Sequence, residues 1–127
     1  MNYLLDTHTF IWFINGDKSL PVDIIEKIRN VKNQCFFSVV GLWEIAIKVK
    51  LDKLQLKSDF KKISKFCLEN EIEILPITFE HILELNKLEF HHRDPFDRLI
   101  IAQAITEDLT IISKDGNFVH YPVKCIW

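Results

Sequence analysis

Four acidic residues lie where a side chain could take part in chemistry: Asp6, Glu44, Asp97 and Asp115. Asp6 directly follows a short apolar stretch, and Asp115 stands at the end of another. Glu44 and Asp97 fall in the first turns of predicted helices. If the apolar stretches are neighbouring parallel strands, all four acids meet at the carboxyl edge of one sheet, where such sheets bind ligands.

Clustered carboxylates repel one another, and this raises the pKa of some of them unless a cation is present. A divalent metal removes that conflict. Because the ligands are hard oxygens with no His or Cys in the set, Mg²⁺ or Mn²⁺ is favoured over zinc. Such a site suits phosphodiester hydrolysis, in which the metal activates water and stabilises the leaving oxygen.

Each acid also has a purely structural interpretation. Asp6 could simply favour the positive end of a helix dipole, and Glu44 could form an i, i+4 pair with Lys48 on a helix surface. Asp115 precedes Gly116, which is a common turn sequence. The four positions together, rather than any one of them, favour a shared site.

Asp94 and Asp97 stand one turn apart and must be distinguished. Asp94 precedes Pro95, which suits the first position of a helix, so we expect Asp94 to be the N-cap. Asp97 could complete this capping arrangement, or it could project from the first turn toward Asp6 and Asp115. We predict the second role.

Alternating apolar strands and helices organise the chain around these acids. The predicted strands are Tyr3–Leu5, Cys35–Phe37, Ile72–Leu75, Leu109–Ile112 and Val123–Ile126. The predicted helices include His8–Asn15 with Thr7 as N-cap, one capped by Ser38, an amphipathic segment Ser58–Asn70, one from the Thr78 cap to about Leu88, and Phe96–Thr106. This alternation predicts an α/β fold with a mainly parallel sheet and helices on both faces.

Composition sets the remaining limits. With 127 residues, 48% of them hydrophobic, the chain is expected to form one domain spanning residues 1–127. It shows no signal-peptide pattern and no apolar run long enough to span a membrane, so a cytoplasmic location is expected. Its three cysteines, Cys35, Cys67 and Cys125, lie far apart in apolar sequence and are expected to be reduced.

A net charge of −2 argues against a generally basic surface, but the charge is unevenly distributed. One stretch is rich in lysine, and this lysine flank comprises Lys48, Lys50, Lys53, Lys57, Lys61, Lys62 and Lys65. It is either a solvated helical face, the commoner case, or a surface that attracts phosphates or a protein partner.

Four motifs occur in order over essentially the whole chain. They are Leu4-Leu5-Asp6-Thr7-His8 with Trp12, Ser38 to Lys48 with Trp43-Glu44, His92-Arg93-Asp94-Pro95-Phe96-Asp97-Arg98 running into Ile101-Ala102-Gln103-Ala104, and Ser113-Lys114-Asp115. In this ordered set the sequence resembles the PIN-domain ribonucleases, and within them the VapC-type toxins of bacterial toxin–antitoxin pairs.

This resemblance implies a three-layer α/β/α fold and Mg²⁺- or Mn²⁺-dependent endonucleolytic cleavage of RNA. It also implies a homodimer and inhibition by a cognate antitoxin. The antitoxin, and not this chain, would contact operator DNA. The four acids match the metal-site positions of the family.

Other positions match supporting residues of the family. Thr7 resembles the hydroxyl residue that supports the first acid, and Ser113 stands where the family often has threonine. Arg98 and Lys48 are each either an ion-pair partner or a phosphate contact.

Three alternatives remain. A phosphatase with an aspartyl nucleophile at Asp6 usually has a second acid two residues later, where this chain has His8. A phosphoacceptor receiver module requires an acid at the end of its central strand, where Leu75 and Pro76 stand. The third alternative is a catalytically silent PIN-like module that binds RNA or protein.

Overall fold

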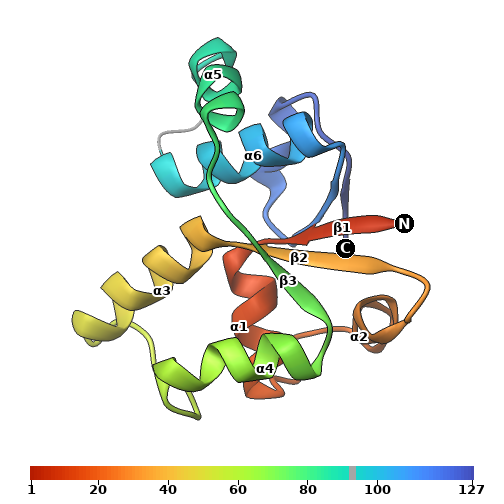
Figure 1. Ribbon diagram of the computed structural model, residues 1–127, viewed down its shortest axis with the longest axis vertical. Coiled ribbons are helices and arrows are strands. Elements are labelled where there is room, and N and C mark those ends of the chain that lie inside the picture. Colours follow the sequence, from red (N-terminus) through yellow and green to blue (C-terminus); the bar gives the residue numbers. More distant parts are fainter. Residues whose placement is uncertain (92–93) are drawn as a thin grey trace.

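The computed structural model describes residues 1–91 and 94–127 and contains a five-stranded, all-parallel sheet (Figure 1). The strand order is β3-β2-β1-β4-β5. The strands are β1 (Asn2–Leu5), β2 (Gln34–Ser38), β3 (Ile72–Leu75), β4 (Thr110–Ile112) and β5 (Cys125–Ile126). The parallel sheet predicted from the alternation of strands and helices is confirmed.

Strand β1 lies at the centre of the sheet and fixes the register of its neighbours. Leu5 pairs with Phe37 of β2 on one side and with Ile112 of β4 on the other. The next residue, Asp6, donates its backbone N–H to the carbonyl of Ile112 at 3.2 Å. The end of β1 therefore lies beside the end of β4, which is the condition for Asp6 and Asp115 to share one edge of the sheet.

Helices cover both faces of this sheet and give the fold three layers (Figure 1). They are α1 (Thr7–Asn15), α2 (Val22–Arg29), α3 (Val39–Lys50), α4 (Ile63–Glu69), α5 (Phe79–Lys87) and α6 (Pro95–Glu107), with 3-10 turns η1 (Phe60–Lys62) and η2 (Gly116–His120). Successive strand residues point to opposite faces. Leu5 thus packs in the core with α1, α2 and α4, and Leu4 packs in the core with α6.

Several predicted boundaries differ from the structure. Thr7 is not the cap of the first helix; that prediction was wrong, because the carboxylate of Asp6 accepts the Thr9 N–H and Thr7 is already helical. The amphipathic segment Ser58–Asn70 divides into η1 and α4. The predicted last strand shortens to Cys125–Ile126. His92 and Arg93 of the sequence motif lie outside the described residues.

The cysteines are free thiols, as expected. Burial raises the pKa of Cys35 and of Cys67 to about 11, so both thiols are protonated near neutral pH. In the described part of the chain, no helix has the length and apolar character needed to cross a membrane.

Candidate functional site

Asp6 lies at the junction of β1 and α1 and is almost completely buried, with 5% of its surface exposed. One carboxylate oxygen, Oδ1, accepts the backbone N–H of Thr9 at 2.7 Å and so caps α1. The other, Oδ2, accepts a hydrogen bond from the Ser113 hydroxyl. The strand-to-helix transition therefore places this carboxylate at the sheet edge and fixes both of its oxygens.

Ser113 connects Asp6 to Asp115. It follows β4, and its hydroxyl oxygen also accepts the backbone N–H of Asp115 at 3.0 Å. Asp115 is exposed and caps η2, because its Oδ1 accepts the Asn117 N–H at 2.9 Å. One hydroxyl thus fixes the buried acid and the loop that carries the exposed acid.

Burial raises the pKa of Asp6 above its ordinary value of 3.8, because desolvation disfavours the charged carboxylate. The hydrogen bonds from Ser113 and Thr9 and, to a smaller extent, the nearby His8 side chain act in the opposite direction but do not cancel the effect. Within residues 1–91 and 94–127, no ion pair joins Asp6 to a basic side chain. The groups that donate hydrogen bonds to this carboxylate are both neutral.

Glu44, on α3, is buried to a similar degree, with 4% exposed, but its partners differ. Its Oε1 accepts the Thr7 hydroxyl at 2.8 Å, and its Oε2 forms an ion pair of 2.8 Å with Lys48 one turn later. Thr7 therefore supports the second acid rather than Asp6. Since Thr7 follows Asp6 directly, this contact joins α3 to the start of α1.

Gly41 allows α3 to pack closely on the ring of Phe37 in β2 and on Thr7 of α1. A Cβ atom at Gly41 would clash with the ring of Phe37 and would lie 3.3 Å from the Thr7 hydroxyl oxygen. Gly41 could not be identified from the sequence, because the need for a position without a side chain arises only from packing.

Asp94 and Asp97 open α6 in different ways. Asp94 is the N-cap, as predicted, since its Oδ1 accepts the N–H groups of Phe96 at 2.9 Å and Asp97 at 3.2 Å. Asp97 is half-buried in the first turn. The ring of Phe96 packs edge-on against Trp43, the neighbour of Glu44, with centroids 5.0 Å apart. Helices α3 and α6 begin on the side of the sheet where β1 ends (Figure 1).

A hollow of about 250 Å³ opens at this edge, lined by Asp6, His8, Thr9, Trp12, Lys114 and Asp115. Two of the four predicted acids thus line one cavity. From the sequence, Lys114 had no predicted role, and His8 and Trp12 entered only as parts of the motifs that carry the family resemblance. His8 stands two residues after Asp6 and Lys114 stands next to Asp115, so proximity to the two acids was the available signal.

The donor chemistry of this edge fits a hard cation. Carboxylate and hydroxyl oxygens are the ligands that Mg²⁺ and Mn²⁺ prefer. Asp6 also forms no ion pair among the described residues, so a cation there would balance a buried charge. In that part of the chain, no three acidic, histidine or cysteine side chains are already grouped closely enough to hold an ion.

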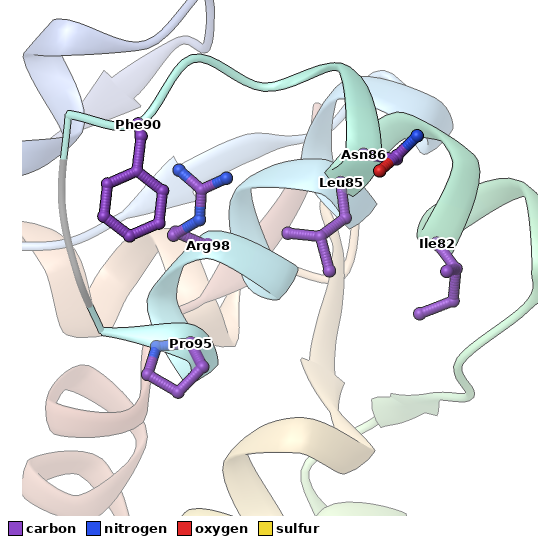
Figure 2. Close-up of a pocket in the computed structure, with 6 residues that line it drawn as sticks. All are labelled: Ile82, Leu85, Asn86, Phe90, Pro95 and Arg98. Carbon is purple, nitrogen blue, oxygen red and sulfur yellow. The ribbon is translucent and has the colours of Figure 1, made fainter.

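Arg98 points away from the acids. Its Nη1 donates to the carbonyl of Glu89 at 2.8 Å, and its guanidinium lies 4.6 Å from the centre of the Phe90 ring. Figure 2 shows this pair in a second hollow, of about 380 Å³, between α5 and α6. None of the four acids lines this hollow. Arg98 therefore ties the segment after α5 to α6.

The lysine flank extends from the end of α3 through η1 to α4. Lys48 is half-buried and forms an ion pair with Glu44, whereas the other six lysines are exposed. Two of those six have acidic neighbours: Lys61 lies 3.7 Å from Asp59, and Lys65 lies 3.8 Å from Glu69. A role in binding phosphates or a protein stays a prediction.

The model of the PIN domain family matches residues 3–124. A VapBC2 structure from Rickettsia felis, bound to a DNA fragment from its promoter, is similar with a TM-score of 0.72 and 20% identity, covering 99% of this chain and 98% of that one. The structure of DNA-bound VapBC from Salmonella typhimurium is similar with a TM-score of 0.71 and 19% identity, covering 99% of this chain and 97% of that one. The structure of FitAcB from Neisseria gonorrhoeae is similar with a TM-score of 0.67 and 19% identity, covering 98% of this chain and 96% of that one. No curated protein matches the sequence.

Proposed function

We propose that this chain, which belongs to the PIN domain family, is an Mg²⁺- or Mn²⁺-dependent endoribonuclease acting at the edge formed by Asp6, Glu44, Asp97 and Asp115. One observation carries the proposal. Asp6, a buried carboxylate that forms no ion pair among the described residues, shares a hollow with Asp115 at the carboxyl edge of a parallel sheet. In such sheets this edge is where ligands bind.

In this proposal the four acids hold the metal. When bound, a divalent ion activates water and neutralises charge on the scissile phosphate. Ser113 orients Asp6 and the Asp115 loop, and Thr7 orients Glu44. Lys48 balances the charge of Glu44, so the net negative charge met by an incoming phosphate is smaller than four carboxylates would give.

We further propose that the chain is the toxin of a toxin–antitoxin pair, spanning residues 1–127 as one domain. The solved structures to which its fold is similar include toxin–antitoxin complexes, some of them bound to DNA. The partners implied are a cognate antitoxin, a second copy of the chain in a homodimer, and operator DNA only through the antitoxin. A cytoplasmic location follows from this role.

A catalytically silent PIN-like module that binds RNA or protein is the second candidate. The ion pair between Glu44 and Lys48 favours it, because an ammonium group at 2.8 Å occupies a carboxylate oxygen that a metal would otherwise use. In this case the chain would bind its partner without cutting it.

A metal-titrated cleavage assay on mixed cellular RNA tests the proposal. We expect fragments with Mg²⁺ or Mn²⁺, none with EDTA, and none from the Asp97→Asn variant at any metal concentration. Asp94→Asn is the matched control, since it alters an acid one turn away whose carboxylate caps the helix. Uncut RNA with the wild-type chain, together with measurable RNA binding, would favour the silent module.

A further inference from the structure

Three polar side chains are buried together beside α6. They are Ser38, His81 and Gln103, each with 0% of its surface exposed. Ser38 ends β2 and caps α3, His81 lies in the first turn of α5, and Gln103 lies in α6. Gln103 belongs to the motif Ile101–Ala104, whose other members are buried and apolar. A buried polar group is costly unless it is hydrogen-bonded, so this glutamine requires an explanation that the proposed metal site does not supply.

The side-chain amide of Gln103 forms hydrogen bonds at both of its ends. Its Oε1 accepts the hydroxyl of Ser38, and its Nε2 donates to the carbonyl of Pro76 at 3.2 Å. The Ser38 oxygen in turn accepts the N–H of Val40 at 3.0 Å, as the N-cap of α3. A carbonyl can only accept a hydrogen bond, so Pro76 determines which end of the amide is Nε2. Gln103 therefore joins α6 to the cap of α3 and to the residue after β3.

His81 holds the turn between β3 and α5. Its Nδ1 accepts the N–H of Thr78 at 3.0 Å, and its own N–H donates to the Thr78 hydroxyl at 3.3 Å, which closes a capping box. Nδ1 also lies 3.5 Å from Nε2 of Gln103. Because Nδ1 accepts, the ring proton is on Nε2, which has no hydrogen-bond partner among the described residues and lies 3.8 Å from Oε1 of Glu107. The contacts of Nδ1 therefore hold the ring in place.

The hydrogen bond between Gln103 and Ser38 connects the two helices that carry proposed metal ligands. Gln103 and Asp97 both lie on α6, and Ser38 caps α3, which carries Glu44. A misplacement of about 1 Å, caused by a change far from the reacting atoms, can slow a reaction about a hundredfold. The place of α3 against α6 therefore matters for the spacing of the two acids.

We propose that Gln103 is a positioning residue for the acidic site. Through Ser38 it sets the place of α3 against α6, and with it the spacing of Glu44 from Asp97, while His81 holds the turn that orients its amide. Gln103 acts through Ser38, and not on the RNA or the ion itself. This inference rests on the proposed function and adds to it a residue that determines how well the acids hold an ion.

Gln103→Met tests this role, because methionine has a similar length and fits an apolar helix but makes neither bond of the amide. We expect the Kd for Mn²⁺, measured by calorimetric titration, to rise about tenfold, and RNA cleavage at saturating metal to fall about tenfold or more. A residue that only stabilises the fold would change the melting temperature alone. Each variant is measured at a temperature at which thermal melting shows it to be folded.

Thr106→Val is the matched control. Thr106 also lies on α6 and forms one side-chain hydrogen bond, but its hydroxyl donates to the carbonyl of Ala102 in the same helix, at 2.9 Å. Its replacement should leave Mn²⁺ affinity and cleavage as in the wild type.

His81→Gln is the conservative variant at the neighbouring position. Glutamine is an ordinary capping-box residue there, and its side-chain carbonyl can accept the Thr78 N–H in place of Nδ1. We expect His81→Gln to keep most of the Mn²⁺ affinity and His81→Ala to lose it. Equal losses in these two variants would contradict the part assigned to His81.

The indole N–H signal of Trp43 in a nitrogen-15 NMR spectrum reports on the same spacing without metal or RNA. Trp43 lies on α3, and its ring packs edge-on against Phe96 of α6. Gln103→Met should move this signal and leave those of the other two tryptophans in place. The control variant should move none of the three.

The inference and the proposed function can fail separately. Wild-type Mn²⁺ affinity, cleavage and Trp43 signal in Gln103→Met would overturn the inference and leave the nuclease standing. Equal losses in Thr106→Val would also overturn it, because they would reflect a general loosening of α6. If the wild type neither binds Mn²⁺ nor cuts RNA, the proposed function fails, and a moved Trp43 signal in Gln103→Met would still establish that Gln103 sets the place of α3.

Discussion

Asp6 and Glu44 are buried to nearly the same extent, with 5% and 4% exposed, yet their charges are stabilised differently. Asp6 accepts hydrogen bonds from a backbone amide and a hydroxyl, both of them neutral groups. Glu44 accepts a hydroxyl and an ammonium group. Burial raises the pKa of Asp6, as expected for a desolvated carboxylate that forms no ion pair.

This difference indicates how the two acids would share the work of a metal site. A divalent ion at Asp6 would stabilise a charge that forms no ion pair within the described residues. At Glu44 the ion would compete with Lys48, which already lies 2.8 Å from Oε2. Asp6 should therefore contribute most of the metal affinity, and Glu44 should contribute less.

Asp6→Asn should have the largest effect. We expect RNA cleavage to fall at least about a hundredfold, which corresponds to roughly 2.7 kcal/mol, and the rise in melting temperature on adding Mn²⁺ to disappear. Asparagine still accepts the Thr9 N–H as an N-cap, so the metal-free protein should be as stable or more stable. The measurements are cleavage rates and thermal melting.

Asp17→Asn is the control for this variant. Asp17 also accepts a backbone N–H, that of Ser19 at 2.8 Å, but it does not line the acidic hollow. Normal cleavage by Asp6→Asn, or an equal loss with Asp17→Asn, would show that Asp6 has no special role.

Arg98→Met should lower the free energy of unfolding by about 2 kcal/mol, because it removes the hydrogen bond that the buried, charged Arg98 side chain donates to the Glu89 carbonyl. Cleavage per folded molecule should stay normal, since Arg98 faces the segment after α5. Chemical denaturation and cleavage kinetics on the same preparation check this. A large kinetic loss at unchanged stability would make Arg98 a phosphate contact instead.

Lys48→Met should cost about 1 kcal/mol of stability in the absence of metal, because it leaves the buried Glu44 carboxylate without its cation. The stabilisation by Mn²⁺ should then exceed that of the wild type, since the ion no longer competes with the ammonium group. Lys50→Met, which replaces an exposed lysine on the same helix, is the control. A smaller Mn²⁺ effect than in the wild type would contradict the competition.

The smallest effect concerns pH. Because the pKa of Asp6 is raised in the folded protein, the folded state holds that proton more tightly than the unfolded chain does. Metal-free stability should therefore fall as pH rises from about 4 through the raised pKa, and the loss should be complete above it. Asp6→Asn should lack this component of the pH profile in chemical denaturation. An unchanged profile would mean that other groups produce it.

Local rules predicted much of the fold and part of the site. The Asp94 cap followed from the proline after it, and the shared edge of Asp6 and Asp115 followed from the apolar strands before them. The same rules failed at Thr7, because both Asp6 and Thr7 are acceptable caps and only the structure shows that Asp6 accepts the Thr9 N–H.

Contacts between distant segments could not be predicted. The bond from Thr7 to Glu44 spans 37 residues, and the nearby Gly41 leaves space for the Phe37 ring and the Thr7 hydroxyl. The bond from Ser113 to Asp6 spans 107 residues. The ring contact of Trp12 with Trp127 likewise joins α1 to the residue that follows β5. Each depends on how strands and helices pack, which residue type and spacing do not determine.

Calorimetric titration of Mn²⁺ into the wild type, Asp94→Asn and Asp97→Asn tests the central claim most directly. The two variants each remove one charge within one turn of α6, and Asp94→Asn keeps a good cap, so its stability should fall by at most about 1 kcal/mol. We predict that the wild type and Asp94→Asn bind Mn²⁺ alike and that Asp97→Asn binds it much more weakly. No heat of binding with the wild type at millimolar Mn²⁺, or loss of binding in Asp94→Asn with normal binding in Asp97→Asn, would contradict the assigned metal site.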